Sequence, residues 1–291
     1  MVTSGPVTIR EARLDDVEAI LAFATDTFPW GDYIPQFLEE WITDDGAVHV
    51  ACIDDVPVGM MRLSFLSDSE LWSQAARVHP DHRGRRIASA LQDAQVAWAR
   101  ERGGLIIRMQ VEDDNEPSIA HAMRYGFKRA ASVVRAVRPV GAASPNPSGN
   151  GGRRHPSLLV ARPGKRQDVQ LVRSSWETSE VARRLRQLAP IGWQFRRLSD
   201  ADIEGAAASG NLWEIGNSWV ITGSVEPVCE VRLIDTTPDE AYDVCKALVD
   251  LANNRGAELL TLWIPDLDWT VQAVRRVGCD TEGFGVWELP L

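Results

Sequence analysis

The chain has 291 residues, of which 44% are hydrophobic and 25% are charged, a composition typical of a soluble globular protein with about two domains. Its formal net charge of -10 argues against broad nucleic-acid binding, which requires a basic surface. No apolar run reaches the roughly 18 residues of a membrane span, and the first residues lack the basic and apolar segments of a signal peptide. We therefore expect a cytoplasmic protein without nucleic-acid or membrane partners.

The first half of the sequence predicts strands and helices that alternate along the chain. Period-two alternation or buried apolar runs predict the strands, and apolar residues at helical spacing predict the helices. The predicted strands cover residues 7–12, 47–55, 56–66, 71–78, 104–111 and 127–137, and the predicted helices cover residues 13–28, 33–42, 87–102 and 116–126.

A basic loop precedes the helix predicted at residues 87–102. Arg83, Arg85 and Arg86 stand there, although a helix N-terminus already carries a positive partial charge and acidic side chains are usual beside it. Three guanidinium groups at such a position in an acidic chain predict that an anion binds between them.

The segment that follows the first set of elements, residues 139–157, is rich in Gly, Pro, Ser and Asn and predicts a flexible linker. Short matches relate the sequences on its two sides at a constant offset of 152 or 153 residues. The matched positions include Asp16 with Asp168, Ala99 with Ala252, and Arg124 with Arg276. Because the matches keep their order and offset, they predict two copies of one fold, at residues 1–138 and 158–291.

The second copy ends with the same succession of elements as the first. Its predicted strands cover residues 228–235, 257–264 and 286–289, and its predicted helices cover residues 239–255 and 268–278. It lacks the basic loop. Asp239, Glu240 and Asp243 stand at the helix start, where carboxylates would repel an anion, and Thr237 before Pro238 predicts an ordinary N-cap followed by a first helical residue. We therefore predict no anionic cofactor in the second copy.

Several motifs of the first copy resemble the GNAT acetyltransferase superfamily. The loop from Arg83 to Ala88 is similar to the family signature Arg/Gln-x-x-Gly-x-Gly/Ala, with Arg86 at the place of a glycine. A Val-x-Pro sequence precedes the loop, and Asn115 stands at the family's distance from a Gly-Phe pair. The resemblance covers most of residues 5–138. It implies an α/β (α+β) protein of two tandem GNAT folds, each a mixed, mostly antiparallel sheet flanked by helices, with the second copy degenerate.

The resemblance also implies acetyl-coenzyme A as co-substrate. Backbone amides at the helix start would bind its pyrophosphate, Gly84 and Ala88 would let the backbone approach it, and the arginines would add charge-assisted hydrogen bonds. The expected cofactor-binding residues are Arg77, Val78, Arg83, Gly84, Arg85, Arg86, Ile87, Ala88 and Asn115. No metal is expected, because the four cysteines are scattered and no histidine cluster accompanies them.

The catalytic positions depart from the family pattern. A carboxylate four residues before the strand-end valine often deprotonates the amine in this family, but here that residue is Gln74. The tyrosine that often protonates the thiolate is replaced by Ala122, and we interpret Tyr125, three residues later, as a packing residue. Two explanations are open: the substrate is a small-molecule α-amine, or catalysis uses water held by Gln74 and a more distant acid such as Glu112.

A narrower resemblance concerns the acceptor side. The segment from Phe28 to Trp41 is similar to the histidine N-acetyltransferase-like branch, which carries an Asp-Tyr-x-Pro segment with a tryptophan soon after. It implies that Trp30, Asp32 and Tyr33 line the acceptor pocket, with Asp32 pairing a substrate cation. The alternative is that the aromatic residues pack a corner between helices and Asp32 caps a helix.

These inferences predict an acyl-CoA-dependent N-acyltransferase (EC 2.3.1 class) that acetylates an amine. An α-amine near pKa 8 is about a tenth neutral at pH 7, whereas a lysine near 10.4 is under a thousandth neutral. A site without a carboxylate base therefore favours the α-amine of a small molecule such as an amino acid. The alternative is a catalytically weak tandem that senses acetyl-CoA or serves as an interaction module, and a homodimer is left open.

Overall fold

The structure is a computed structural model that describes residues 5–25, 31–141, 159–223 and 227–291. The chain forms two compact units. Unit 1 contains residues 1–109, 117–128 and 287–291, and unit 2 contains residues 110–116 and 129–286. The linker predicted at residues 139–157 lies almost entirely outside the described residues.

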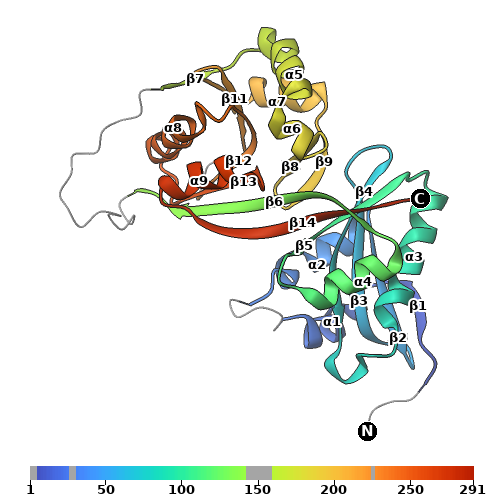
Figure 1. The fold of residues 1–291 in the computed structure, drawn as a ribbon. Helices are drawn as coiled ribbons and strands as arrows, with labels where there is room; N and C mark the ends of the chain where they lie inside the picture. Colours follow the sequence, from blue (N-terminus) through green and yellow to red (C-terminus); the bar gives the residue numbers. More distant parts are fainter. Residues whose placement is uncertain (1–4, 26–30, 142–158, 224–226) are drawn as a thin grey trace. The chain divides into compact units, whose positions relative to one another are not determined.

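Unit 1 is built on strands that follow the order β1-β2-β3-β4-β5 (Figure 1). The first three pairings are antiparallel and the pairing of β4 with β5 is parallel. The strands are β1 (Thr8–Glu11), β2 (Ala47–Ile53), β3 (Val56–Phe65), β4 (Glu70–Val78) and β5 (Ile106–Glu112), and the helices are α1 (Val17–Ala24), α2 (Ile34–Thr43), α3 (Ile87–Glu101) and α4 (Glu116–Tyr125).

The two faces of this sheet are covered by different helices. Along β2, Val50 and Cys52 pack with the buried residues of α1 and α2, whereas Ala51 and Ile53 pack with Leu91 and its neighbours on α3. Successive side chains of a strand point to opposite faces, so a strand that is apolar on both faces requires cover on both. The parallel connection from β4 to β5 supplies that cover through α3.

Unit 2 repeats this pairing pattern. Its sheet has the order β6-β13-β12-β11-β10-β7, with β12 and β13 parallel and the other pairs antiparallel. The strands are β6 (Lys128–Pro139), β7 (Ala161–Pro163), β10 (Leu212–Ile215), β11 (Ser218–Thr222), β12 (Val228–Asp235) and β13 (Leu259–Pro265), with the hairpin β8 (Leu188–Ile191) and β9 (Gln194–Arg197) apart and β14 (Asp280–Pro290) last. The succession β7-β10-β11-β12-β13 thus mirrors β1-β2-β3-β4-β5.

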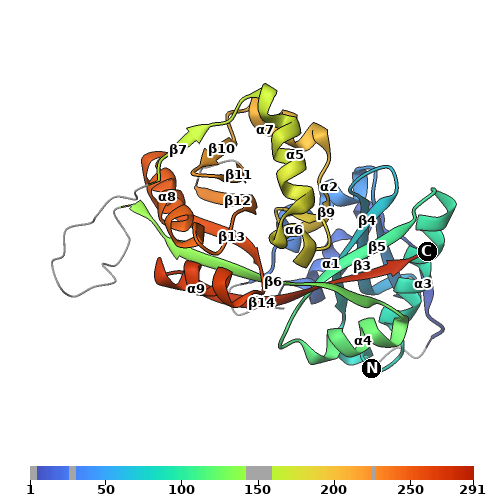
Figure 2. The same ribbon diagram turned by 45° about the horizontal axis from the view of Figure 1, so that its top comes forward.

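The helices of unit 2 also lie on two faces (Figure 2). They are α5 (Val169–Thr178), α6 (Glu180–Arg184), α7 (Asp200–Ala208), α8 (Ala241–Asn254) and α9 (Asp268–Arg276). Leu248 of α8 and Val274 of α9 share a buried core with Val231 and Leu262 of the sheet. Helices α5, α6 and α7 lie on the other side of the same sheet.

The expected α/β class and the main elements of both halves are confirmed, with boundaries shifted by a few residues. One helix start was predicted wrongly. Thr237 is not the N-cap of α8, because the helix begins at Ala241 and Glu240 takes that position. The carbonyl of Thr237 nevertheless accepts the amide of Ala241 at 2.9 Å, so the chain already turns there.

The strand that ends the first half belongs mostly to unit 2, and the last residues of the chain belong to unit 1. Strand β6, which follows α4 in sequence, pairs with β13 from Val133 to Pro139 within unit 2. The final residues of the chain belong to unit 1, where the amide of Leu291 donates to the carbonyl of Leu105 at 3.0 Å. The Glu288 carboxylate there lies 3.6 Å from Arg108.

The described residues were also compared with what a membrane span or a metal site requires. None of their helices is long and apolar enough to cross a membrane. The same residues contain no group of three or more His, Cys, Asp or Glu side chains that could hold a metal ion.

Candidate functional site

The loop between β4 and α3 has a backbone that favours small residues. Gly84 has φ +78°, and a Cβ atom added there would meet nothing within 4 Å. Arg86, the N-cap of α3, has φ 60° and ψ 21°, the left-handed conformation that a glycine adopts without strain. A glycine at this position is therefore the easier choice, and Arg86 holds the same backbone shape at a cost of roughly 1–2 kcal/mol.

The start of α3 presents unpaired backbone amides. The helical bond from the amide of Ala90 to the carbonyl of Arg86 is 3.1 Å long. The amides of Ile87, Ala88 and Ser89 precede that bond, so the helix itself offers them no acceptor. Together with the helix dipole, they form a site suited to a phosphate.

A cavity of about 720 Å³ lies over this helix start. It is bordered by β4, the loop, the first turns of α3 and one face of α4. Its lining residues are Val78, His82, Arg83, Gly84, Arg86, Ile87, Ala88, Ser89, Ala90, Asp93, His121, Arg124 and Tyr125. Six of the expected cofactor-binding residues are thus brought together around one cavity within unit 1.

The basic side chains of the loop have different surroundings. Arg83 and Arg86 line the cavity and are exposed. Arg85 instead contacts Nδ1 of the buried His82 at 3.1 Å and donates to the carbonyl of Gly5 at 3.1 Å. Arg85 therefore fixes the loop, while Arg83 and Arg86, with Arg124 of α4, give the cavity its positive charge.

Strand β4 is irregular at the edge of the cavity. Its register with β3 slips by one residue, because Met60 pairs with Arg77 whereas Arg62 pairs with Gln74. Ala75 within this bulge has φ 58°. The parallel pairing with β5 ends at Trp72, so the last residues of β4 diverge from β5 and end at Val78 beside the loop. Bulges of this kind often lie next to active sites.

The expected catalytic residues Gln74 and Glu112 and the expected cofactor residue Asn115 do not line this cavity. Gln74 is half-buried in β4, next to the bulge. Glu112 and Asn115 belong to unit 2, where the side-chain amide of Asn115 donates to a Glu112 carboxylate oxygen at 3.4 Å. Ala122 is fully buried in α4.

The acceptor-side residues form a connected group with Arg77. The carboxylate of Asp32, which is fully buried, lies 2.9 Å from the guanidinium of Arg77. Asp32, which precedes the N-cap Tyr33, also accepts the amide of Ile34, the first residue of α2, at 3.2 Å. Tyr33 packs edge-on against Trp41 with ring centres 6.0 Å apart. These contacts favour the alternative in which Asp32 binds a helix start, and Trp30 lies outside the described residues.

Seven lining residues were not among the expected cofactor residues: His82, Ser89, Ala90, Asp93, His121, Arg124 and Tyr125. His121, Arg124 and Tyr125 share one face of α4, and the Tyr125 hydroxyl donates to Asp93 of α3 at 2.7 Å. Burial and the bond to Asp93 raise the pKa of Tyr125, and burial and Arg124 lower the pKa of His121. Both side chains are thus neutral at pH 7. The spacing of three and four residues in the sequence was the signal for this face.

The corresponding helix start of unit 2 is closed by a carboxylate. Glu240 accepts the amide and the side-chain amide of Asn217, at 3.1 and 2.6 Å, and the hydroxyl of Ser218 at 2.8 Å. A negative side chain thus stands at the N-cap of α8, where it would repel a phosphate.

Comparisons with known proteins agree with this geometry. The model of the acetyltransferase (GNAT) family matches residues 15–127. A solved structure of a GCN5-related N-acetyltransferase from Sphaerobacter thermophilus is 11% identical, with a TM-score of 0.66 over 99% of this chain and 97% of that chain. One from Kribbella flavida is 12% identical, with a TM-score of 0.53 over 100% of this chain and 72% of that chain.

A third structure, from Thermoplasma acidophilum, is 18% identical and has a TM-score of 0.61 over 98% of this chain and the whole of that chain. At such low identity these likenesses show a shared fold, which here extends over both halves. No curated protein matches the chain. Residues 15–127 therefore match a GNAT acetyltransferase domain, and the chain as a whole shares the fold of these structures.

Proposed function

We propose that the protein is an acyl-CoA-dependent N-acyltransferase (EC 2.3.1 class) that transfers an acetyl group from acetyl-CoA to the α-amine of a small molecule such as an amino acid. The observation that carries the proposal is the helix start of α3, where unpaired amides, Gly84 and two exposed arginines surround one cavity. The catalytic half is then residues 1–138, and the half at residues 158–291 binds no acyl-CoA.

The residues around the cavity fit a CoA molecule. The amides of Ile87, Ala88 and Ser89 would hold the pyrophosphate, and Gly84 leaves the space that a Cβ would occupy. Arg83 and Arg86 would neutralise the phosphate charges. Bound there, acetyl-CoA supplies a thioester, and the diverging end of β4 at Val78 offers backbone amides that can polarise its carbonyl.

The residues near β4 suit an amine that is already partly neutral. Gln74 can hold a water by hydrogen bonds but cannot accept the proton of an ammonium group. A positioned base contributes about 10²- to 10⁴-fold. An α-amine loses less from its absence than a lysine does, because a larger fraction of it is neutral at pH 7.

A thiol-release assay with matched amines tests this proposal. Amino acid amides offer only an α-amine, whereas Nα-acetyl-lysine amide offers only an ε-amine. We expect release with the first group and a rate at least tenfold lower with the second at pH 7. The variant Gln74→Glu places a carboxylate in β4 and should raise kcat/KM for the ε-amine by about tenfold or more.

The alternative is a tandem that binds acetyl-CoA as a sensor or an interaction module. Two observations favour it: Gln74 replaces a carboxylate, and the buried Ala122 offers no proton donor. Tight acetyl-CoA binding without thiol release for any amine would support the sensor and contradict the enzyme.

A further inference from the structure

Unit 2 contains a second cavity, of about 380 Å³, on the side of its sheet opposite α8. The β8–β9 hairpin and α7 border it from above, and β11 and β12 form its floor. The lining residues are Ala189, Pro190, Ile191, Arg196, Arg197, Leu198, Ala201, Asp202, Gly205, Ala206, Ser209, Asn211, Ile221, Thr222, Arg232 and Leu233. Small-molecule sites typically have this size and this mixture of apolar walls with a few polar groups.

The floor of this cavity carries the same irregularity as β4. In the pairing of β11 with β12, Ile221 lies opposite Leu233 but Thr222 lies opposite Val231, so Arg232 has no opposite residue. Arg232 stands three residues before the end of β12, and Ala75 stands three residues before the end of β4. Unit 2 has therefore lost the phosphate loop and kept the bulge, which here turns Arg232 towards the cavity.

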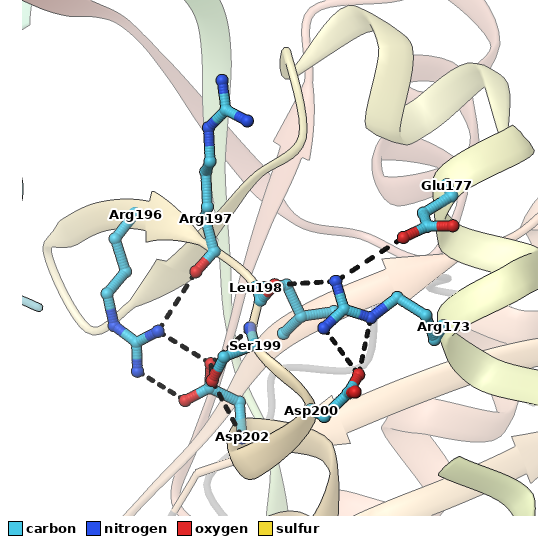
Figure 3. Close-up of polar contacts among 8 residues, drawn as sticks. All are labelled: Arg173, Glu177, Arg196, Arg197, Leu198, Ser199, Asp200 and Asp202. Atoms are coloured by element: carbon cyan, nitrogen blue, oxygen red, sulfur yellow. Dashed lines mark hydrogen bonds and ion pairs between the residues drawn. The ribbon is translucent and has the colours of Figure 1, made fainter. Parts of the chain in front are cut away.

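The charges at the cavity wall are fixed by a hydrogen-bond network (Figure 3). Arg196 donates to the Asp202 carboxylate at 2.7 Å and to the carbonyl of Arg197 at 3.1 Å. Asp202 also accepts the amide and hydroxyl of Ser199, which caps α7. Burial raises the pKa of Asp202, but its bonds to Arg196 and Ser199 outweigh burial and the net pKa is lowered. Asp202, the one carboxylate of the lining, is thus already hydrogen-bonded to Arg196 and Ser199.

The remaining charge of the lining is positive. Three arginines and one aspartate line the cavity, and Arg196 is the partner of Asp202. Glu230, outside the lining, pairs with Nε of Arg232 at 3.1 Å, and the Arg232 side chain is 40% exposed. A planar guanidinium presents its remaining N–H groups as a fork that suits a carboxylate or a phosphate.

Gly205 of α7 borders a space that no described residue fills. Gly205 lies in the middle of the helix and lines the cavity, and a Cβ added there would meet no atom within 4 Å. A mid-helix glycine is less favourable than alanine by roughly 1 kcal/mol. No packing contact explains the glycine, whereas a ligand that lies against α7 would.

We propose that this cavity is a binding site for a small organic anion, whose carboxylate or phosphate group pairs with Arg232 and whose apolar body lies against Gly205 and the α7 face. The site is independent of the acetyl-CoA cavity and needs no chemical step in unit 2. Its ligand is a small molecule, because the cavity has a volume of only about 380 Å³.

Ligand-observed NMR with the full-length protein tests the site. The probes are 4-fluorobenzoate and 4-fluorophenyl phosphate, with 4-fluorobenzamide as the uncharged analogue of the first. We expect broadening of one or both anions and none of the amide. Arg232→Gln should weaken binding at least tenfold. Preference for one anion assigns the carboxylate or the phosphate class.

Gly205→Leu is the second variant, because leucine favours the helix and fills the cavity. It should abolish binding while Tm stays the same or rises, which separates loss of the site from loss of the fold. Ala208→Leu, on the same helix but outside the lining, is the matched control and should bind as the parent does. Saturating CoA should leave the signal unchanged. Equal binding of the amide, unaltered binding in both variants, displacement by CoA, or no binding of either anion would each overturn the proposal.

Discussion

The buried carboxylate of Asp32 joins two parts of unit 1 by pairing with Arg77 at 2.9 Å. One of its oxygens accepts the amide of Ile34 at the start of α2, and the other contacts the guanidinium at the end of β4. The ion pair therefore holds α2 to β4, whose end borders the cavity at the start of α3. Its side chains are 0% and 13% exposed, so water screens it little.

Breaking this pair should destabilise unit 1. Asp32→Asn leaves the Arg77 charge without its counter-ion and should cost on the order of 2–4 kcal/mol in the free energy of unfolding. The double variant Asp32→Asn/Arg77→Gln should recover at least about 1 kcal/mol of that loss. Chemical denaturation of the parent, the two single variants and the double variant measures the coupling. Strictly additive losses would show that the two side chains do not stabilise each other.

Replacing Arg86 by glycine should separate backbone strain from charge. The change relieves roughly 1–2 kcal/mol of left-handed strain, but glycine costs about 0.5–1 kcal/mol of chain entropy, so Tm should change little. Acetyl-CoA affinity should fall about tenfold because one charge-assisted hydrogen bond is lost. Unchanged affinity would mean that Arg86 shapes the loop without contacting the phosphates.

Tyr125 should not act as the proton donor to the thiolate. Its hydroxyl is bonded to Asp93 and its pKa is raised, so it is a poor acid. Tyr125→Phe should change kcat by less than about threefold, whereas loss of a positioned acid typically costs about 10²- to 10⁴-fold. Steady-state kinetics over a pH series distinguishes the two cases, and a large fall in kcat would assign Tyr125 to the chemistry.

Asp235 should give unit 2 a pH-dependent stability. Burial raises the pKa of this carboxyl, against the opposing effect of hydroxyl bonds from Ser175 and Ser179. The folded state therefore favours the protonated form, and stability falls as pH rises from the ordinary aspartate pKa through the raised one. The penalty therefore grows with rising pH across that range.

Asp235→Asn removes that penalty and should raise Tm at pH 7. The difference in Tm from the parent should shrink as pH is lowered towards the ordinary aspartate pKa of about 3.9. Thermal melts from pH 4 to 8 measure it, with Asp16→Asn as a contrast of opposite sign. Bonds from Arg10 lower the pKa of Asp16, so the stability that it adds is lost as pH falls.

The sequence predicted the elements because their signals are local. Alternation along residues 47–66 and the helical spacing after Arg86 depend on neighbouring residues alone, and both regions form as expected. The sequence did not predict in this way that β6 belongs to unit 2 and that the chain's last residues belong to unit 1. This depends on which strand edge is available, and the residues of β6 alone do not identify its partner strand.

The same distinction applies to the site. The loop could be found from Arg83, Gly84 and Ala88 because consecutive residues build it. The pair of Asp32 with Arg77 could not, since 45 residues separate them and only the fold brings them together. The bulge at Ala75 also left no trace in the sequence, because alanine is an unusual residue for φ 58°.

Isothermal titration of the full-length protein with acetyl-CoA, comparing Gly84→Ala with Gly103→Ala, tests the central claim most directly. Both glycines have φ near +80°, and neither has an atom within 4 Å of an added Cβ, so both variants carry the same strain of roughly 1–2 kcal/mol. They lie before and after the same helix, but only Gly84 lines the cavity. We expect the parent and Gly103→Ala to bind acetyl-CoA alike and Gly84→Ala to bind at least tenfold more weakly. Absence of binding by the folded parent, or equal affinity in the two variants, would contradict that claim.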